Sequence, residues 1–127
     1  MKNANGIQKP RDIVERTFDF AVRIVQLSGK LDQRPGVGRI IMSQILRAGT
    51  SIPSNVEEAQ AGQSKADFIS KMSIALKEAR ETHLRLRLLA TAKIVPDAEP
   101  LPMIDEAEEI KRVIGAIIVS SRRNSPV

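Results

Sequence analysis

The sequence predicts an all-α fold, an antiparallel up-down four-helix bundle. Apolar residues recur every three to four positions in four separate stretches, which is the period of an amphipathic helix. No stretch of the sequence keeps the alternation of apolar and polar residues that is typical of a strand. Only three of the 127 residues are aromatic, so we expect a core of aliphatic side chains, which suits helices packed ridge into groove.

The chain length of 127 residues corresponds to one domain. Residues 1–10 are polar and contain Gly6 and Pro10, so we expect them to form a mobile N-terminal arm. We expect residues 11–121 to form the four-helix bundle and residues 122–127 to form a basic C-terminal tail.

The first expected helix, from about Arg11 to Leu31, has an unusually wide apolar stripe. One row contains Ile13, Thr17, Phe20, Ile24, Leu27 and Leu31. An adjacent row contains Val14, Phe18, Ala21 and Val25. A helix in a monomeric bundle needs one buried face, so a second subunit could cover part of this stripe, although a thick monomer core explains it equally well. On the first interpretation, Phe18, Phe20 and Ile24 belong to an oligomer interface.

The second expected helix follows a turn that contains Pro35, Gly36 and Gly38. Its apolar stripe consists of Ile41, Ile45, Ala48, Ile52, Val56 and Ala59. Pro53 lies inside this stripe, and proline has no amide proton to donate to the preceding turn. We therefore expect helix 2 to be kinked, or briefly broken, near Pro53.

The third and fourth expected helices are separated by a proline-rich loop. Ser64 and Asp67 are spaced as in a capping box, which predicts a helix that starts at Lys65 and ends near Ile94. Three prolines between residues 96 and 102 predict the loop. The inward face of the last helix is expected to contain Ile104, Ala107, Ile110, Ile114, Ile117 and Ile118.

The charges are divided unevenly between these two helices. Residues 63–94 contain seven Lys and Arg against three Asp and Glu, whereas residues 95–121 contain two against six. Lys77, Arg80 and Arg87 share one stripe of the third helix, and Asp105 and Glu108 form an acidic row on the fourth. The basic stripe could face this acidic row, in the same or a neighbouring subunit, or it could stay exposed and attract phosphates. We favour the first alternative.

Catalysis is not expected, because the chain has no cysteine and one histidine, His83. A di-metal carboxylate site in a bundle needs Glu and His at positions i and i+3 on two helices, whereas Glu81 stands two residues before His83. We therefore expect no catalytic residues, no metal and no cofactor, and we assign His83 to packing or to the oligomer interface. The longest uncharged runs have nine residues, far below the ~20 that span a bilayer, so we expect a cytoplasmic protein without a membrane partner.

Two blocks of the sequence carry a family resemblance. The run from Gln44 to Glu58 and the block from Ser73 to Thr82, together with Phe68 and residues 84–89, resemble a bacterial four-helix-bundle family. Its members include proteins encoded by intervening sequences of 23S ribosomal RNA genes, and a related protein is the accessory protein of diversity-generating retroelements. The sequence departs from the family pattern at Ala59, where glycine is usual, and lacks an aromatic pair near His83.

The resemblance implies a homopentamer of largely unassigned function, and it supports nucleic-acid binding by analogy. We therefore expect a non-catalytic homo-oligomer that binds RNA or DNA non-specifically. The residues expected to contact nucleic acid are Arg47, Lys77, Arg80, Arg85 and Arg87. The alternative is a scaffold or adaptor whose partner is another protein and which binds no nucleic acid.

Overall fold

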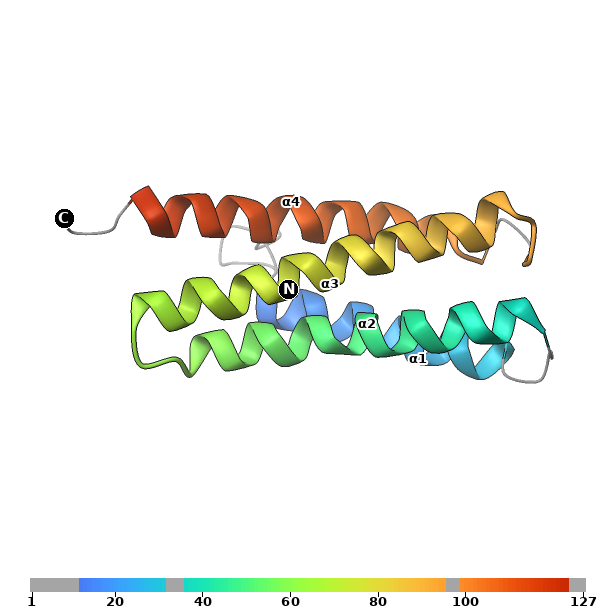
Figure 1. Cartoon of the computed structure of the whole chain (residues 1–127), viewed down its shortest axis with the longest axis horizontal. Helices are drawn as coiled ribbons and strands as arrows, with labels where there is room; N and C mark the ends of the chain where they lie inside the picture. Colours follow the sequence, from blue (N-terminus) through green and yellow to red (C-terminus); the bar gives the residue numbers. More distant parts are fainter. Residues whose placement is uncertain (1–11, 32–35, 96–98, 124–127) are drawn as a thin grey trace, which may run out of the picture.

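The computed structural model describes residues 12–31, 36–95 and 99–123. These residues form four helices and no strand: α1 (Ile13–Leu31), α2 (Val37–Gln60), α3 (Lys65–Thr91) and α4 (Leu101–Arg123). Consecutive helices run in opposite directions (Figure 1). The predicted all-α, four-helix-bundle class is therefore confirmed. The expected N-terminal arm and residues 124–127 lie outside the described residues, whereas Arg122 and Arg123 belong to α4.

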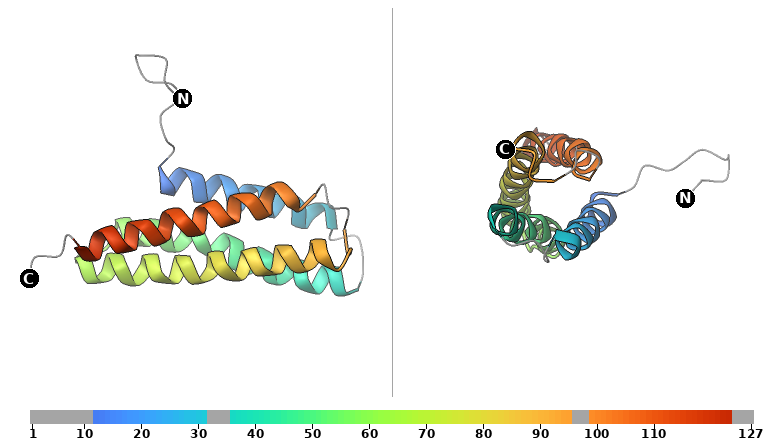
Figure 2. Two further views of the ribbon diagram at one scale, coloured as in Figure 1. Left: turned by 90° about the horizontal axis from the view of Figure 1, so that it is seen from above. Right: turned by 90° about the vertical axis from the view of Figure 1, so that its right-hand side faces the viewer.

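The helices are arranged as a ring in which each helix packs against two others. Contacts within the described residues join α1 to α2, α2 to α3, α3 to α4 and α1 to α4, and the last of these contacts is the least extensive. The end-on view in Figure 2 shows that the ring is most open between α1 and α4. No helix in the described ranges is both long enough and apolar enough to cross a membrane.

The interior is aliphatic, as expected from the near absence of aromatic residues. Phe20 is the one phenylalanine among the fully buried side chains, and its neighbours in the core are mainly Ile, Leu, Val, Met and Ala. Burying one such large aliphatic side chain contributes roughly 1.5–3 kcal/mol to stability. The stripes predicted for α1, α2 and α4 supply Ile24, Ile45, Ile52, Ile110 and Ile114 to this core, and α3 adds Leu86 and Leu89.

Helix α2 is continuous from Val37 to Gln60 with Pro53 inside it, so the short break expected there is wrong. The kink near Pro53 stays a prediction. Gly49, four residues before Pro53, is buried against α1: a Cβ atom at this position would lie 3.0 Å from Cγ1 of Ile24. The glycine therefore allows the close approach of α1 and α2.

The two ends of α3 are both capped. At the N-terminus, the Ser64 hydroxyl accepts a hydrogen bond of 3.0 Å from the Asp67 amide, as the capping-box spacing predicted. At the C-terminus, Lys93 has a φ of 58°, and the amides of Lys93 and Ile94 donate to the carbonyls of Ala90 and Leu89. This is a Schellman motif, and it ends the helix at Thr91, three residues before the expected end.

Candidate interaction surfaces

The outward side of α3 carries cations and aliphatic side chains together. We define the α3 outer face as Ile74, Lys77, Arg80, Leu84, Arg87 and Leu88, all of which are exposed. In the part of the chain that the structure describes, no ion pair or hydrogen bond engages the side chain of Lys77, Arg80 or Arg87. Leu84 is 50% exposed and Leu88 is 48% exposed. This surface therefore offers three unpaired cations on a partly apolar background.

The acidic row of α4 does not neutralise these cations within one subunit. Glu108 instead forms ion pairs with Lys111 at 3.0 Å and Arg112 at 3.5 Å, and its Oε2 atom lies 3.4 Å from Nε2 of His83 on α3. The hydrogen bond from Lys111, more than any other contact, lowers the pKa of Glu108. The favoured prediction, that the basic stripe pairs with this acidic row, is thus wrong within one chain. Pairing with the acidic row of a neighbouring copy stays a prediction.

Two of the residues predicted to contact nucleic acid are engaged by acids at the α2–α3 contact. Arg47 of α2 lies 3.9 Å from Glu78 and 3.7 Å from Glu81, and Arg85 lies 3.3 Å from Glu81. Glu78 is 9% exposed, and its Oε2 atom accepts no hydrogen bond. Arg47 therefore serves first to compensate a nearly buried carboxylate, since an unpaired buried charge is costly.

Two members of the second apolar row of α1, Phe18 and Val25, remain on the surface, whereas Ala21 is buried and Val14 is half-buried. Phe18 is 56% exposed and Val25 is 51% exposed. Together with Ala21, Val22, Gln26, Thr50 and Pro53, they line a groove of about 370 Å³ between α1 and α2. We call this the α1 apolar face. Phe20 and Ile24, which were also expected at an oligomer interface, are 1% and 0% exposed within the subunit. They are core residues, and this part of the expectation is corrected.

His83 lies between α3 and α4, with 15% of its side chain exposed and its Nε2 atom 3.4 Å from Oε2 of Glu108. Burial, more than any other effect, lowers the pKa of His83, and the positive charges of Lys111 and Arg87 act in the same direction. The histidine therefore packs within the chain, where α3 meets α4, and its assignment to an oligomer interface stays a prediction. Among the described residues, no group of three or more His, Asp or Glu side chains could hold a metal ion.

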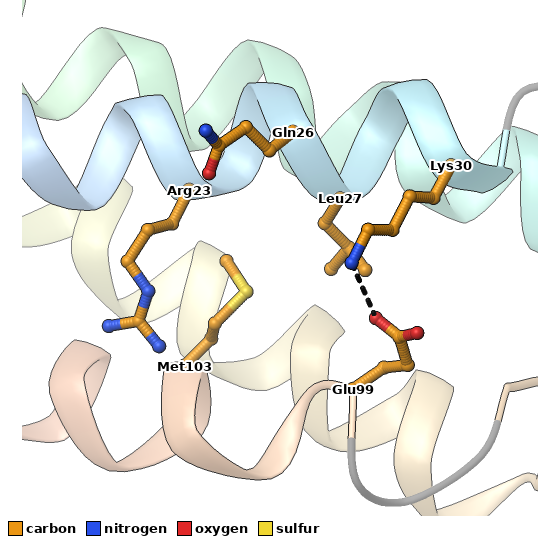
Figure 3. Close-up of a pocket in the computed structure, with 6 residues that line it drawn as sticks. All are labelled: Arg23, Gln26, Leu27, Lys30, Glu99 and Met103. Carbon is orange, nitrogen blue, oxygen red and sulfur yellow. Dashed lines mark ion pairs between the residues drawn. The ribbon is translucent and has the colours of Figure 1, made fainter.

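A further groove of about 250 Å³, at the open side of the bundle, was missed by sequence reasoning. It lies between α1 and α4 and is lined by Arg23, Gln26, Leu27, Lys30, Glu99 and Met103 (Figure 3). No sequence motif marks it, because its walls come from helices that are distant in the chain. One signal was available: Arg16, Arg23 and Lys30 are spaced by seven residues, which places them on one side of a helix.

Comparisons with known proteins agree with the fold described above. A family model described as "23S rRNA-intervening sequence protein" matches residues 9–116. A solved structure of a protein of unknown function, from the S23 ribosomal protein family of Bacteroides thetaiotaomicron, is similar with a TM-score of 0.77 and 39% sequence identity. The similarity covers 84% of this chain and 98% of that chain. No curated protein matches the sequence.

Proposed function

Because the chain belongs to the family of 23S rRNA-intervening sequence proteins, we propose that it is a non-catalytic, self-assembling bacterial protein of the cytoplasm that binds RNA or DNA without sequence preference. The observation that carries this proposal is the α3 outer face, where Lys77, Arg80 and Arg87 are exposed and unpaired within the described residues. Cations that no acid among the described residues neutralises are available to the phosphates of a polynucleotide.

The chemistry of this face supports electrostatic binding rather than base recognition. The chain has no Tyr or Trp and only three Phe, so it has few side chains on which bases could stack. Arginine and lysine neutralise phosphates and release counterions, and each contact adds about −0.9 for duplex DNA, or about −0.7 for a single strand, to the slope of log K against log salt. Three cations in one subunit bind weakly, and an assembly of several copies gains through avidity.

Self-assembly is supported by the α1 apolar face. Phe18, Val22 and Val25 leave apolar area uncovered beside the α1–α2 groove, and contiguous exposed apolar surface marks interaction sites. We propose that a second copy of the chain binds the α1 apolar face. We propose a pentamer, the assembly that the family resemblance implies.

The test of nucleic-acid binding is fluorescence anisotropy with a labelled RNA and a labelled duplex DNA of mixed sequence, measured over a range of salt concentrations. We expect the affinity to fall steeply with salt, with a slope of about −2 or steeper. The double variant Arg80→Glu, Arg87→Glu should bind at least about tenfold more weakly, because two phosphate contacts are replaced by repulsion. Salt-independent binding, or no binding by the wild type, would contradict the proposal.

Arg112→Glu on α4 is the matched control for this experiment. Arg112 is exposed and pairs with Glu108 and Glu109. The single variant Arg112→Glu therefore changes the net charge of the protein by the same amount as the single variant Arg80→Glu or Arg87→Glu, but it leaves the α3 outer face unchanged. Surface ion pairs of this kind contribute little to stability, roughly 0–1 kcal/mol. If Arg112→Glu weakened binding as much as either α3 reversal, the net charge of the protein rather than the α3 outer face would govern binding.

The α3 outer face also favours a second candidate function, that of a scaffold or adaptor for another protein. Ile74, Leu84 and Leu88 are 39%, 50% and 48% exposed among the three cations, and such a mixture is typical of protein interfaces. Size-exclusion chromatography coupled to light scattering, with and without RNA, separates the two functions. A scaffold would show no RNA-dependent increase in mass, and reversal of Arg80 or Arg87 would lower the mass of the assembly itself.

A further inference from the structure

Three cations on α1 face α4 at intervals of seven residues, and two of them are paired with acids. Arg16 at one end forms two hydrogen bonds of 2.8 Å with the carboxylate of Glu106. Lys30 at the other end lies 3.7 Å from Oε2 of Glu99. Arg23, midway between them, has Met103 of α4 beside it in the groove. Among the described residues, the row of ion pairs along this side of α1 therefore has no acid paired with its middle cation, Arg23.

Arg23 is exposed, and no hydrogen bond or ion pair within the described ranges engages its side chain. Figure 3 shows its guanidinium reaching toward α4 beside Met103, with the Lys30–Glu99 pair at the other end of the groove. Gln26 lies on the rim, and Leu27 and Met103 contribute apolar surface. A guanidinium has five N–H donors and no acceptor, so Arg23 presents unused donors to a groove of about 250 Å³.

We propose that this groove binds a phosphate group. Arg23 donates two parallel N–H···O bonds to it, which is the bidentate geometry that arginine forms with oxyanions. Gln26 adds an amide donor, and Lys30 adds positive charge from its place beside Glu99. Arg16 is paired with Glu106 and Lys30 with Glu99, whereas no acid among the described residues pairs with Arg23.

The number of donors favours phosphate over a carboxylate. A phosphate group carries three acceptor oxygens and up to two negative charges, whereas a carboxylate has two oxygens and one charge. Donors that arrive from three separate side chains of α1 match the larger set of acceptors. These oxygens and charges are those of a free or terminal phosphate. A phosphodiester within a polynucleotide presents two unesterified oxygens and one negative charge, and the experiment below separates the two sources.

This site goes beyond the proposed function of the α3 outer face. Within the described residues, α1 and α3 do not pack against each other, and the groove lies on the side of the bundle where α1 meets α4. Substitutions at Arg80 therefore leave the groove intact, and substitutions at Arg23 leave the α3 outer face intact. Each proposal can fail without the other.

The test is a titration of the full-length protein with inorganic phosphate, followed by NMR at constant ionic strength with chloride as the compensating ion. The Arg23 Nε–Hε signal and the Gln26 side-chain amide signals are monitored. We expect both to shift saturably at millimolar phosphate. The shift of the Gln26 signals should be lost in Arg23→Gln, and both shifts should be unchanged in Arg80→Gln, which removes an exposed arginine from α3. A linear, non-saturating response, or wild-type behaviour of Arg23→Gln, would overturn the site.

Gln26→Glu provides a second variant that keeps Arg23 in place. The new carboxylate stands three residues after Arg23, a spacing at which opposite charges pair on a helix. It therefore gives Arg23 an acidic partner on α1 itself. We expect phosphate to bind roughly tenfold more weakly, about the loss of one charge-assisted hydrogen bond. Because Gln26 is exposed, the variant should retain the helical circular dichroism of the wild type. Undiminished phosphate binding by Gln26→Glu would argue against the site.

A second arm of the titration uses a short single-stranded RNA in place of inorganic phosphate. Saturation of the Arg23 signal by RNA alone supports the site and identifies a polynucleotide as the source of the phosphate. Saturation by inorganic phosphate alone supports it and identifies a free ion. If neither ligand saturates the signal, the groove does not bind phosphate.

Discussion

The packing of His83 between α3 and α4 changes its pKa. The imidazole lies between α3 and α4, and burial lowers its pKa below the ordinary value of 6.5, assisted by Lys111 and Arg87 and opposed by Glu108. The unfolded chain therefore binds the proton at a higher pH than the folded chain does. A lowered histidine pKa makes the fold lose stability as the pH falls below about 6.5.

We predict that the free energy of unfolding of the wild type decreases between pH 8 and pH 5.5, and that the decrease is smaller in His83→Gln. Urea denaturation at both pH values measures this. The lower limit of pH 5.5 stays above the range in which Glu108 titrates, since the pKa of Glu108 is lowered from 4.5. An equal decrease in wild type and variant would show that His83 does not cause the pH dependence.

At the scale of helices, the spacing of apolar residues predicted which helices exist, but it did not predict which side of each helix is buried against its neighbours. The two apolar rows of α1 lie side by side, so the sequence could not tell that Phe20 and Ile24 are buried while Phe18 and Val25 are exposed. Only the position of α2 decides this. A break at Pro53, the alternative to the predicted kink, does not form, because the missing hydrogen bond of one proline is a local cost and packing of Ile52 and Val56 in the core favours a continuous helix.

Gly49 lies where α1 packs closely against α2, whereas Gly29 does not, so we expect alanine to have opposite effects at the two positions. Gly49→Ala would place a Cβ atom 3.0 Å and 3.1 Å from the two γ-carbons of Ile24, which is fully buried. Overpacking costs roughly 1–3 kcal/mol, whereas alanine gains about 1 kcal/mol in helix propensity. We predict a net loss of about 1 kcal/mol, measured by urea or thermal denaturation.

Gly29→Ala in α1 is the matched control. Apart from the neighbouring backbone of its own helix, no atom lies within 4 Å of the Cβ position of Gly29, and the residue is exposed. Alanine should therefore stabilise the protein by up to about 1 kcal/mol through helix propensity alone. Stabilisation by both substitutions would mean that α1 can shift away from α2 at little cost.

At the scale of the whole molecule, the sequence predicted the candidate site only in part. Lys77, Arg80 and Arg87 were placed together by their spacing on one helix, and the structure exposes all three. Arg47 and Arg85 were placed with them, yet both meet acids where α2 packs on α3. Contacts between helices depend on their register and on their rotation about their axes, and a period of three to four residues in one helix determines neither.

The surface left uncovered by the fold leads to a prediction about assembly. Phe18 is the most exposed aromatic residue that the structure describes, at 56%, and it lies beside a groove formed with α2. Burying its exposed part would contribute roughly 1 kcal/mol at each subunit contact, and a ring repeats that contribution at every contact. We predict that the double variant Phe18→Ser, Val25→Ser has a lower native mass than the wild type at micromolar concentration, measured by light scattering after size exclusion.

Leu88→Ser separates this explanation from a general loss of surface hydrophobicity. Leu88 is 48% exposed on α3, so its substitution removes a comparable apolar side chain from the α3 outer face. If the α1 apolar face holds the subunits together, Leu88→Ser keeps the wild-type mass and the α1 double variant does not, while circular dichroism shows both to be helical. The reverse result would move the subunit interface to α3, where it would bury the cations assigned to nucleic acid and favour the scaffold function.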